Sequence, residues 1–192
     1  MSIFKLQANL VEKIRGFGNN FHGPKGIGFA FIRKNSGLQP LLLGGEQEKG
    51  MRGGTESVYQ IAGMAKALEM AYTNLDSERA YISDLKEYCA NQLAQRFPNS
   101  KIIGSNNNFY NIINVVLPLS ADKTGMLLFH LDMKGIAVSS GSACQSGSNN
   151  QSHVLAEILS PEELVLPSLR ISFSHYNTKE EIDYLIEVLA TV

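Results

Sequence analysis

The chain has 192 residues, of which 44% are hydrophobic, and a formal net charge of −1. This length allows one good-sized domain, or one domain with a subdomain. The near-neutral charge argues against nucleic acid as the main partner. Because the sequence has no apolar run long enough to span a membrane and no signal-peptide pattern at its start, we expect a cytoplasmic protein.

The first 100 residues alternate between apolar segments and glycine-rich breaks. Residues 1–15 are predicted to form a short helix, because apolar side chains recur there at helical spacing. Residues 26–33 form an apolar run of strand length, and a long loop with five glycines follows at 44–54. A helix is predicted from Thr55, and a second one ends at Pro98. Their expected apolar stripes are Val58, Ile61, Ala62, Ala65, Leu68 and Tyr72 in the first, and Ile82, Leu85, Cys89 and Leu93 in the second.

The remaining residues predict three strands and further helices. The strands are expected at 112–117, 136–139 and 169–173, with a helix at 121–134. Two Ser/Thr-x-x-Glu capping boxes, at Ser160–Glu163 and Thr178–Glu181, mark the starts of two more helices. This alternation is typical of an α/β or α+β subdomain in which helices cover one face of a sheet.

The two cysteines have different surroundings. Cys89 lies on the apolar stripe of a predicted helix and is interpreted as a small core residue. Cys144 lies in the small, polar segment Ser139–Ser148, and the residues alone leave two interpretations: an exposed thiol without a role, or a reactive one. Two distant cysteines and four scattered histidines do not predict a metal site.

Two further residues have both a structural and a functional interpretation. Thr55 follows the glycine-rich loop, where backbone N–H groups and Arg52 could bind an anion, or where Thr55 could serve only as an N-cap. Arg170 alternates with Leu169 and Ile171 on a predicted strand. It is either a solvent-facing strand residue or a bidentate clamp for a carboxylate.

Four segments together resemble the cysteine desulfurases of the class V aminotransferase superfamily. They are Phe21–Gly28, the loop from Gly44 to Glu56, Ser139–Cys144 and Leu169–Ser172, and their order and spacing fit the second half of that family. The Ser-Ser-Gly-Ser-Ala-Cys segment resembles the branch with a long cysteine loop that feeds iron–sulfur scaffold proteins. The resemblance covers residues 21–192.

The resemblance implies a fold, a cofactor and roles for single residues. The implied fold is the C-terminal part of a pyridoxal-phosphate-dependent transferase: an atypical leader at 1–20, a remnant of the large domain at 21–74 and a small α+β domain at 75–192. In such enzymes pyridoxal phosphate serves as the electron sink for L-cysteine. By resemblance, Cys144 accepts the substrate sulfur as a persulfide, Thr55 contacts the cofactor phosphate of the other subunit in a dimer, and Arg170 holds the substrate carboxylate.

The sequence departs from the family at the position of the lysine that binds the cofactor. The family reads Ser-x-His-Lys there, whereas this chain has Phe17-Gly18-Asn19-Asn20, and the amide of Asn20 cannot form a Schiff base. Lys25 belongs to the next turn and is no substitute. The family's upstream half is also missing from the sequence. We therefore expect an incomplete desulfurase that does not hold the cofactor covalently and that associates with itself or with a complementary chain.

Two other functions remain open. A non-catalytic module could relay sulfur on Cys144 or dimerise with a full-length paralogue. A transaminase or lyase of the same superfamily is the other alternative, although such an enzyme needs no thiol at Cys144.

Overall fold

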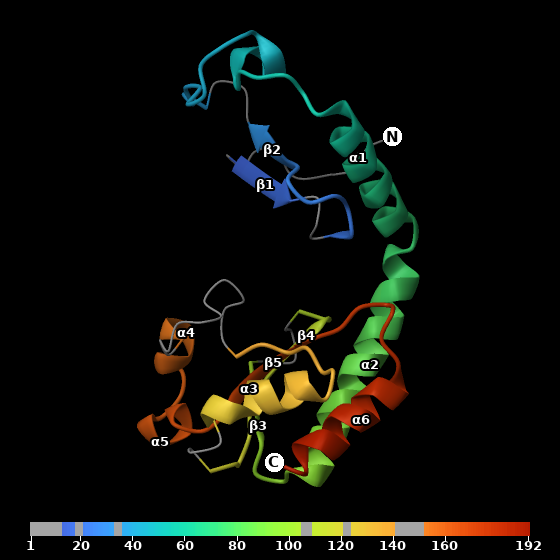
Figure 1. The fold of residues 1–192 in the computed structure, drawn as a ribbon, viewed down its shortest axis with the longest axis vertical. Helices are drawn as coiled ribbons and strands as arrows, with labels where there is room; N and C mark the ends of the chain where they lie inside the picture. The colour runs from blue at the N-terminus through green and yellow to red at the C-terminus, as the bar shows by residue number, and fades with distance from the viewer. Residues whose placement is uncertain (1–12, 18–20, 33–35, 105–108, 121–123, 141–151) are drawn as a thin grey trace. The chain divides into compact units, whose positions relative to one another are not determined.

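The computed structural model describes residues 13–17, 21–32, 36–104, 109–120, 124–140 and 152–192. The chain divides into two compact units, Met1–Leu75 and Asp76–Val192 (Figure 1). Within the described residues, no helix is both long enough and apolar enough to cross a membrane.

The first unit contains a two-stranded sheet and one long helix. Strands β1 (Lys13–Phe17) and β2 (Gly28–Ile32) pair antiparallel, with Lys13 opposite Ile32 and Phe17 opposite Gly28. The predicted helix over 1–15 is therefore wrong from Lys13 onward, because pairing with β2 overrides the local helical spacing; the rest of that prediction lies outside the described residues. The strand predicted at 26–33 is confirmed as β2.

Helix α1 (Val58–Thr73) follows the glycine-rich loop, which includes the short 3₁₀ segment η2 (Gln47–Gly50). The apolar stripe predicted for α1 is present, but none of residues 21–32 and 36–75 of the first unit is buried. Leu41 is 92% exposed and Leu43 82% exposed, and Val58 and Tyr59 are also largely exposed. Phe31 and Ile32 of β2 are exposed as well.

The second unit is built on a three-stranded antiparallel sheet in the order β3–β4–β5. Its strands are β3 (Lys101–Ile103), β4 (Ile112–Val116) and β5 (Ser168–Ser172). The predicted strands at 112–117 and 169–173 correspond to β4 and β5. The strand predicted at 136–139 is reduced to an isolated bridge between Ser139 and Arg170.

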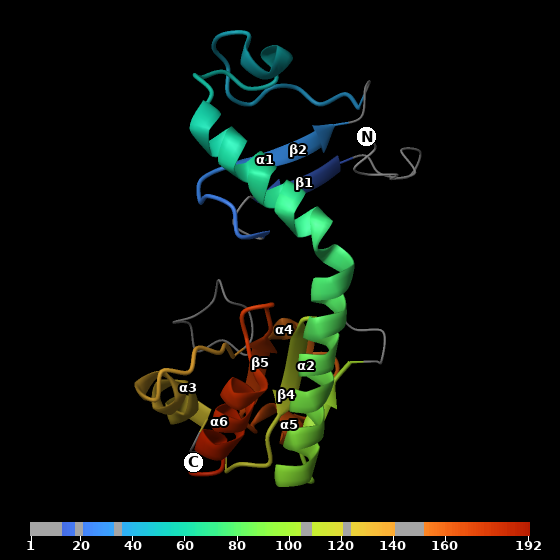
Figure 2. The same ribbon diagram turned by 90° about the vertical axis from the view of Figure 1, so that its right-hand side faces the viewer.

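Helices cover this sheet. They are α2 (Leu75–Arg96), α3 (Thr124–Met133), α4 (His153–Ala156), α5 (Pro161–Leu164) and α6 (Lys179–Leu189). Both predicted capping boxes are confirmed: Ser160 and Glu163 cap α5, and Thr178 and Glu181 cap α6 reciprocally. Helices α2 and α6 lie side by side (Figures 1 and 2), where the Tyr88 hydroxyl donates to Asp183 at 2.6 Å.

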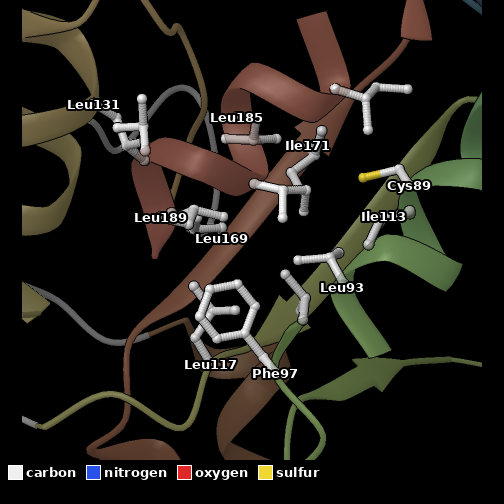
Figure 3. Packing of buried hydrophobic residues seen from close by; sticks show 14 of the residues in the cluster. Cys89, Leu93, Phe97, Ile113, Leu117, Leu131, Leu169, Ile171, Leu185 and Leu189 are labelled. Carbon is white, nitrogen blue, oxygen red and sulfur yellow. The ribbon is translucent and has the colours of Figure 1, made fainter. Parts of the chain in front are cut away.

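One apolar core lies between the sheet and these helices (Figure 3). The predicted stripe of α2 is buried as expected, and α6 presents Leu185 and Leu189 to the same cluster. Alternation along the strands sends only every second side chain inward. The inward-facing members of β4 and β5 are Ile113, Val115, Leu169 and Ile171.

Cys89 is a core residue, as the sequence predicted. Its side chain is fully buried, and burial raises the pKa of its thiol to about 12 from the ordinary value of 9.0. Below pH 9 the thiol is neutral in the folded and unfolded chain alike. Between pH 9 and 12 the unfolded chain releases a proton that the folded chain retains, so stability falls as pH rises.

A Cys89→Ala variant is therefore expected to lose less stability at alkaline pH than the wild-type chain. The thiol contributes a decrease of about 1.4 kcal/mol for each pH unit above 9. Urea unfolding followed at pH 8 and pH 10 measures this slope in both proteins. Equal slopes would show that the Cys89 thiol ionises normally in the folded chain.

Candidate functional site

Arg170 lies on the face of the sheet opposite to the core. Its neighbours Leu169 and Ile171 are buried in the core cluster, and Figure 3 shows both among the packed side chains. Arg170 itself is half-buried. Among the described residues, its guanidinium has no hydrogen-bond or ion-pair partner. The fork of a guanidinium matches the two oxygens of a carboxylate, so a half-buried Arg170 can bind one.

The backbone of Arg170 is paired with Ser139. The Ser139 N–H donates to the Arg170 carbonyl at 3.2 Å, and the Arg170 N–H donates to the Ser139 carbonyl at 2.6 Å. Ser139 is the first residue of the Ser139–Cys144 segment. The structure thus brings together two of the segments singled out in the sequence.

Cys144, the residue matched to the sulfur acceptor, lies outside the described residues. In the sequence it follows Ser139 by five residues.

Asn114 is a neighbour of Arg170 that the sequence analysis does not single out. It stands directly opposite Arg170 in the β4–β5 pair and is half-buried on the same face of the sheet. The one signal in the sequence was a polar residue in the apolar strand Ile-Ile-Asn-Val-Val. Its cross-strand partner could not be inferred without the register.

Thr55 belongs to the first unit and is exposed. It does not begin the helix as predicted, because residues 55–57 are not helical and α1 begins at Val58. Ser57 is the N-cap residue, and helical bonding starts where the Ile61 N–H donates to the Ser57 carbonyl at 3.0 Å. Thr55 is thus neither the start of α1 nor its N-cap.

The loop before Thr55 is closed by contacts between its own ends. The Gly53 N–H donates to the Leu42 carbonyl at 2.9 Å, and the Gly54 N–H donates to the Gln47 side chain at 3.2 Å. A Cβ on Gly53 would lie 2.8 Å from the Gly44 Cα. Position 53 therefore requires glycine, whereas a Cβ on Gly44 would make an ordinary contact at 3.4 Å.

The turn after Asn20 is fixed on α1. The Gln60 side chain donates to the Lys25 carbonyl at 3.0 Å, and a Cβ on Gly63 would lie 2.9 Å from the Pro24 ring. The Lys25 side chain is exposed at the edge of this turn. Asn20 lies outside the described residues.

Metal ligands do not gather in the part of the chain that the structure describes, since no group of three His, Cys, Asp or Glu residues there could hold an ion. Two regions of the described chain remain as candidates for binding a ligand. They are the face of the sheet that carries Arg170 and the glycine-rich loop before Thr55.

Comparison with known proteins gives consistent matches. The profile of the family described as aminotransferase class-V matches residues 18–185. A cysteine desulfurase IscS from Dictyoglomus turgidum is 38% identical over 175 residues, which cover 91% of this chain and 44% of that protein. A cysteine desulfurase from Gluconacetobacter diazotrophicus is 37% identical over 193 residues, covering 98% of this chain and 48% of that protein.

Solved structures agree. A NifS-like protein superimposes with a TM-score of 0.82 at 30% identity, covering 98% of this chain and 48% of that chain. The present chain thus spans about half the length of the curated relatives that it matches.

Proposed function

The chain belongs to the aminotransferase class-V family, and we propose that it is the half of a cysteine desulfurase that holds the substrate carboxylate and accepts the sulfur. In this proposal the assembled protein converts L-cysteine to L-alanine in the cytoplasm. The sulfur passes to Cys144 as a persulfide and from there to an iron–sulfur scaffold protein. The pairing of Ser139 with Arg170 is the observation that carries the proposal, because it links the cysteine segment to the residue matched to the carboxylate clamp.

The roles of the two residues follow from their chemistry. Arg170 binds the α-carboxylate through two parallel N–H···O bonds and so orients the amino acid. The thiolate of Cys144 then attacks the substrate sulfur and forms the S–S bond of the persulfide. The electron pair of the broken C–S bond must pass to another group, and neither Arg170 nor Cys144 can accept it.

The cofactor of this family, pyridoxal phosphate, supplies such an electron sink when bound. This chain fits the cofactor only in part. The exposed Thr55 hydroxyl at the end of a well-defined loop suits a phosphate. The second hydroxyl near the start of α1, that of Ser57, is less suited to a phosphate. It is buried and has no hydrogen-bond partner among the described residues. At the position of the family's lysine, Asn20 offers no amine.

The residues present therefore do not fit a covalently held cofactor. In our proposal the chain associates with itself or with another polypeptide, and only a complementary chain with a different sequence supplies the amine that Asn20 lacks. The exposed apolar side chains of the first unit, such as Leu41 and Leu43, support an association of this kind.

The purified 192-residue chain is expected to stay colourless after incubation with pyridoxal phosphate and dialysis, and to release no sulfide from L-cysteine. Absorbance spectra and a sulfide assay check both points, with a complete cysteine desulfurase as the positive control. An Asn20→Lys variant tests the cause, because a restored amine should allow borohydride to fix the cofactor covalently. A yellow, active wild-type preparation would overturn the argument from Asn20.

Asn20 also favours a second candidate function. Without its own electron sink, the chain could serve as a sulfur-relay module that receives a persulfide sulfur already made by another enzyme. This exchange breaks one S–S bond and forms another, so it needs no cofactor.

A further inference from the structure

We propose that Asn114 and Arg170 together form the site that binds the substrate α-carboxylate. The inference rests on the proposed function, because it assigns a second binding residue to the site of Arg170. It is carried by the register of the sheet and by the lack of other partners for the two side chains.

The register makes Asn114 the nearest cross-strand neighbour of Arg170. In an antiparallel sheet the N–H and C=O of one residue point to the same neighbouring strand, and those of Arg170 point to Ser139. Two bonds at the ends of the β4–β5 ladder agree with this: the Phe173 N–H donates to the Asn111 carbonyl, and the Leu117 N–H donates to the Pro167 carbonyl. Hydrogen-bonded pairs recur at every second position, and the pair of Asn114 and Arg170 falls between them. Asn114 and Arg170 are therefore a non-hydrogen-bonded pair, in which side chains lie closest, with Cβ atoms about 4.5–5.5 Å apart.

Both side chains point away from the core. Their strand neighbours Ile113, Val115, Leu169 and Ile171 are packed in the cluster of Figure 3, so alternation sends Asn114 and Arg170 to the other face. Both are half-buried. Among the described residues neither side chain has a hydrogen-bond or ion-pair partner. Two adjacent polar groups that are not engaged by other described residues can both reach one ligand.

The chemistry of the pair selects a carboxylate. The guanidinium donates two parallel N–H groups to the two oxygens of a carboxylate, and the Asn114 amide adds a neutral donor at its edge. The Asn114 carbonyl can in turn accept from the guanidinium and hold its plane. Ser139 flanks Arg170 on the opposite side, so the carboxylate site lies between Asn114 and the start of the segment that leads to Cys144.

The experiment titrates the ¹⁵N-labelled chain, without cofactor, with L-alanine and with ethylamine, which is L-alanine without its carboxylate. L-Alanine is expected to shift the backbone signals of β4 and β5, and ethylamine is not. Asn114→Leu is expected to weaken L-alanine binding about tenfold, because one hydrogen bond to a charged ligand is lost. Asn114→Asp keeps the size but pairs with Arg170, and it should weaken binding further. Asn91→Leu, the same change at an exposed position of α2, is the control and should bind normally.

The outcomes distinguish the proposed role of Asn114 from that of Arg170. If Arg170→Leu abolishes binding but both Asn114 variants bind like the wild type, the role of Asn114 is refuted while that of Arg170 stands. If the wild-type chain does not distinguish L-alanine from ethylamine, or if Arg170→Leu binds normally, the carboxylate site is refuted for both residues. Dispersed NMR spectra of each variant verify that it folds.

Discussion

A Cys144→Ser variant is expected to take up no sulfur from a mixture of L-cysteine and a catalytic amount of an active cysteine desulfurase, whereas the wild-type chain gains one sulfur atom. In the wild type the Cys144 thiolate attacks the outer sulfur of the donor persulfide. The donor S–S bond breaks, a new S–S bond forms, and the donor leaves as a thiolate. A serine hydroxyl is not deprotonated at neutral pH and cannot perform this exchange. Mass spectrometry of the intact protein measures the added sulfur directly.

The chain contains its own control, because Cys89 should not compete. At pH 8 a thiol with a pKa of about 12 is ionised in roughly one molecule in ten thousand, and the folded chain also covers this side chain completely. A Cys89→Ala variant should therefore take up sulfur as the wild type does. Sulfur found on Cys89 would contradict the inertness of that buried thiol. No sulfur on Cys144 of the wild-type chain would refute the relay alternative.

The elements that were predicted correctly are those with strong local signals. Both capping boxes and the stripe of α2 depend on residues within one or two helical turns, and the folded chain uses them unchanged. Strand β3 was missed because three mostly exposed residues leave no alternation to detect. Local spacing predicts a helix where β1 forms, because pairing with β2 leaves no signal in the local sequence. The apolar stripe of α1 is predicted by its spacing, but spacing alone does not say whether a stripe is buried, because burial depends on surfaces outside the helix.

The candidate site shows the same limit. Arg170 could be selected because a charged residue between two buried ones is visible in the sequence. Asn114 could not be paired with it, because the two residues are far apart in the chain and only the β4–β5 register places them side by side. The position of Thr55 after the glycines predicts a helix start there, but α1 begins at Val58 and Ser57 is its N-cap residue. A hydroxyl residue after a glycine-rich loop indicates that a helix start is near, and it does not decide which of two nearby hydroxyl residues is the N-cap.

Leu93→Ala is expected to destabilise the second unit by about 2–5 kcal/mol, since Leu93 is fully buried and its truncation leaves a cavity in the core. This is a large part of the roughly 5–15 kcal/mol that stabilises an ordinary domain. Hydrogen exchange of peptides from α2 and β4 measures the loss in the second unit specifically. Unchanged protection there would show that the core does not hold this unit together.

Leu43→Ala is the matched control, because it makes the same change at a side chain that is 82% exposed. Its effect on the isolated chain should stay within about 0.5 kcal/mol. The contrast has a functional consequence, because the face that carries Arg170 and Asn114 is the reverse side of the sheet that Leu93 supports. If carboxylate binding is a property of this sheet, Leu93→Ala should reduce it and Leu43→Ala should not. If Leu43→Ala alone weakened the binding of L-alanine, the first unit would have to contribute to the site, and the sheet of the second unit would not be sufficient for recognition.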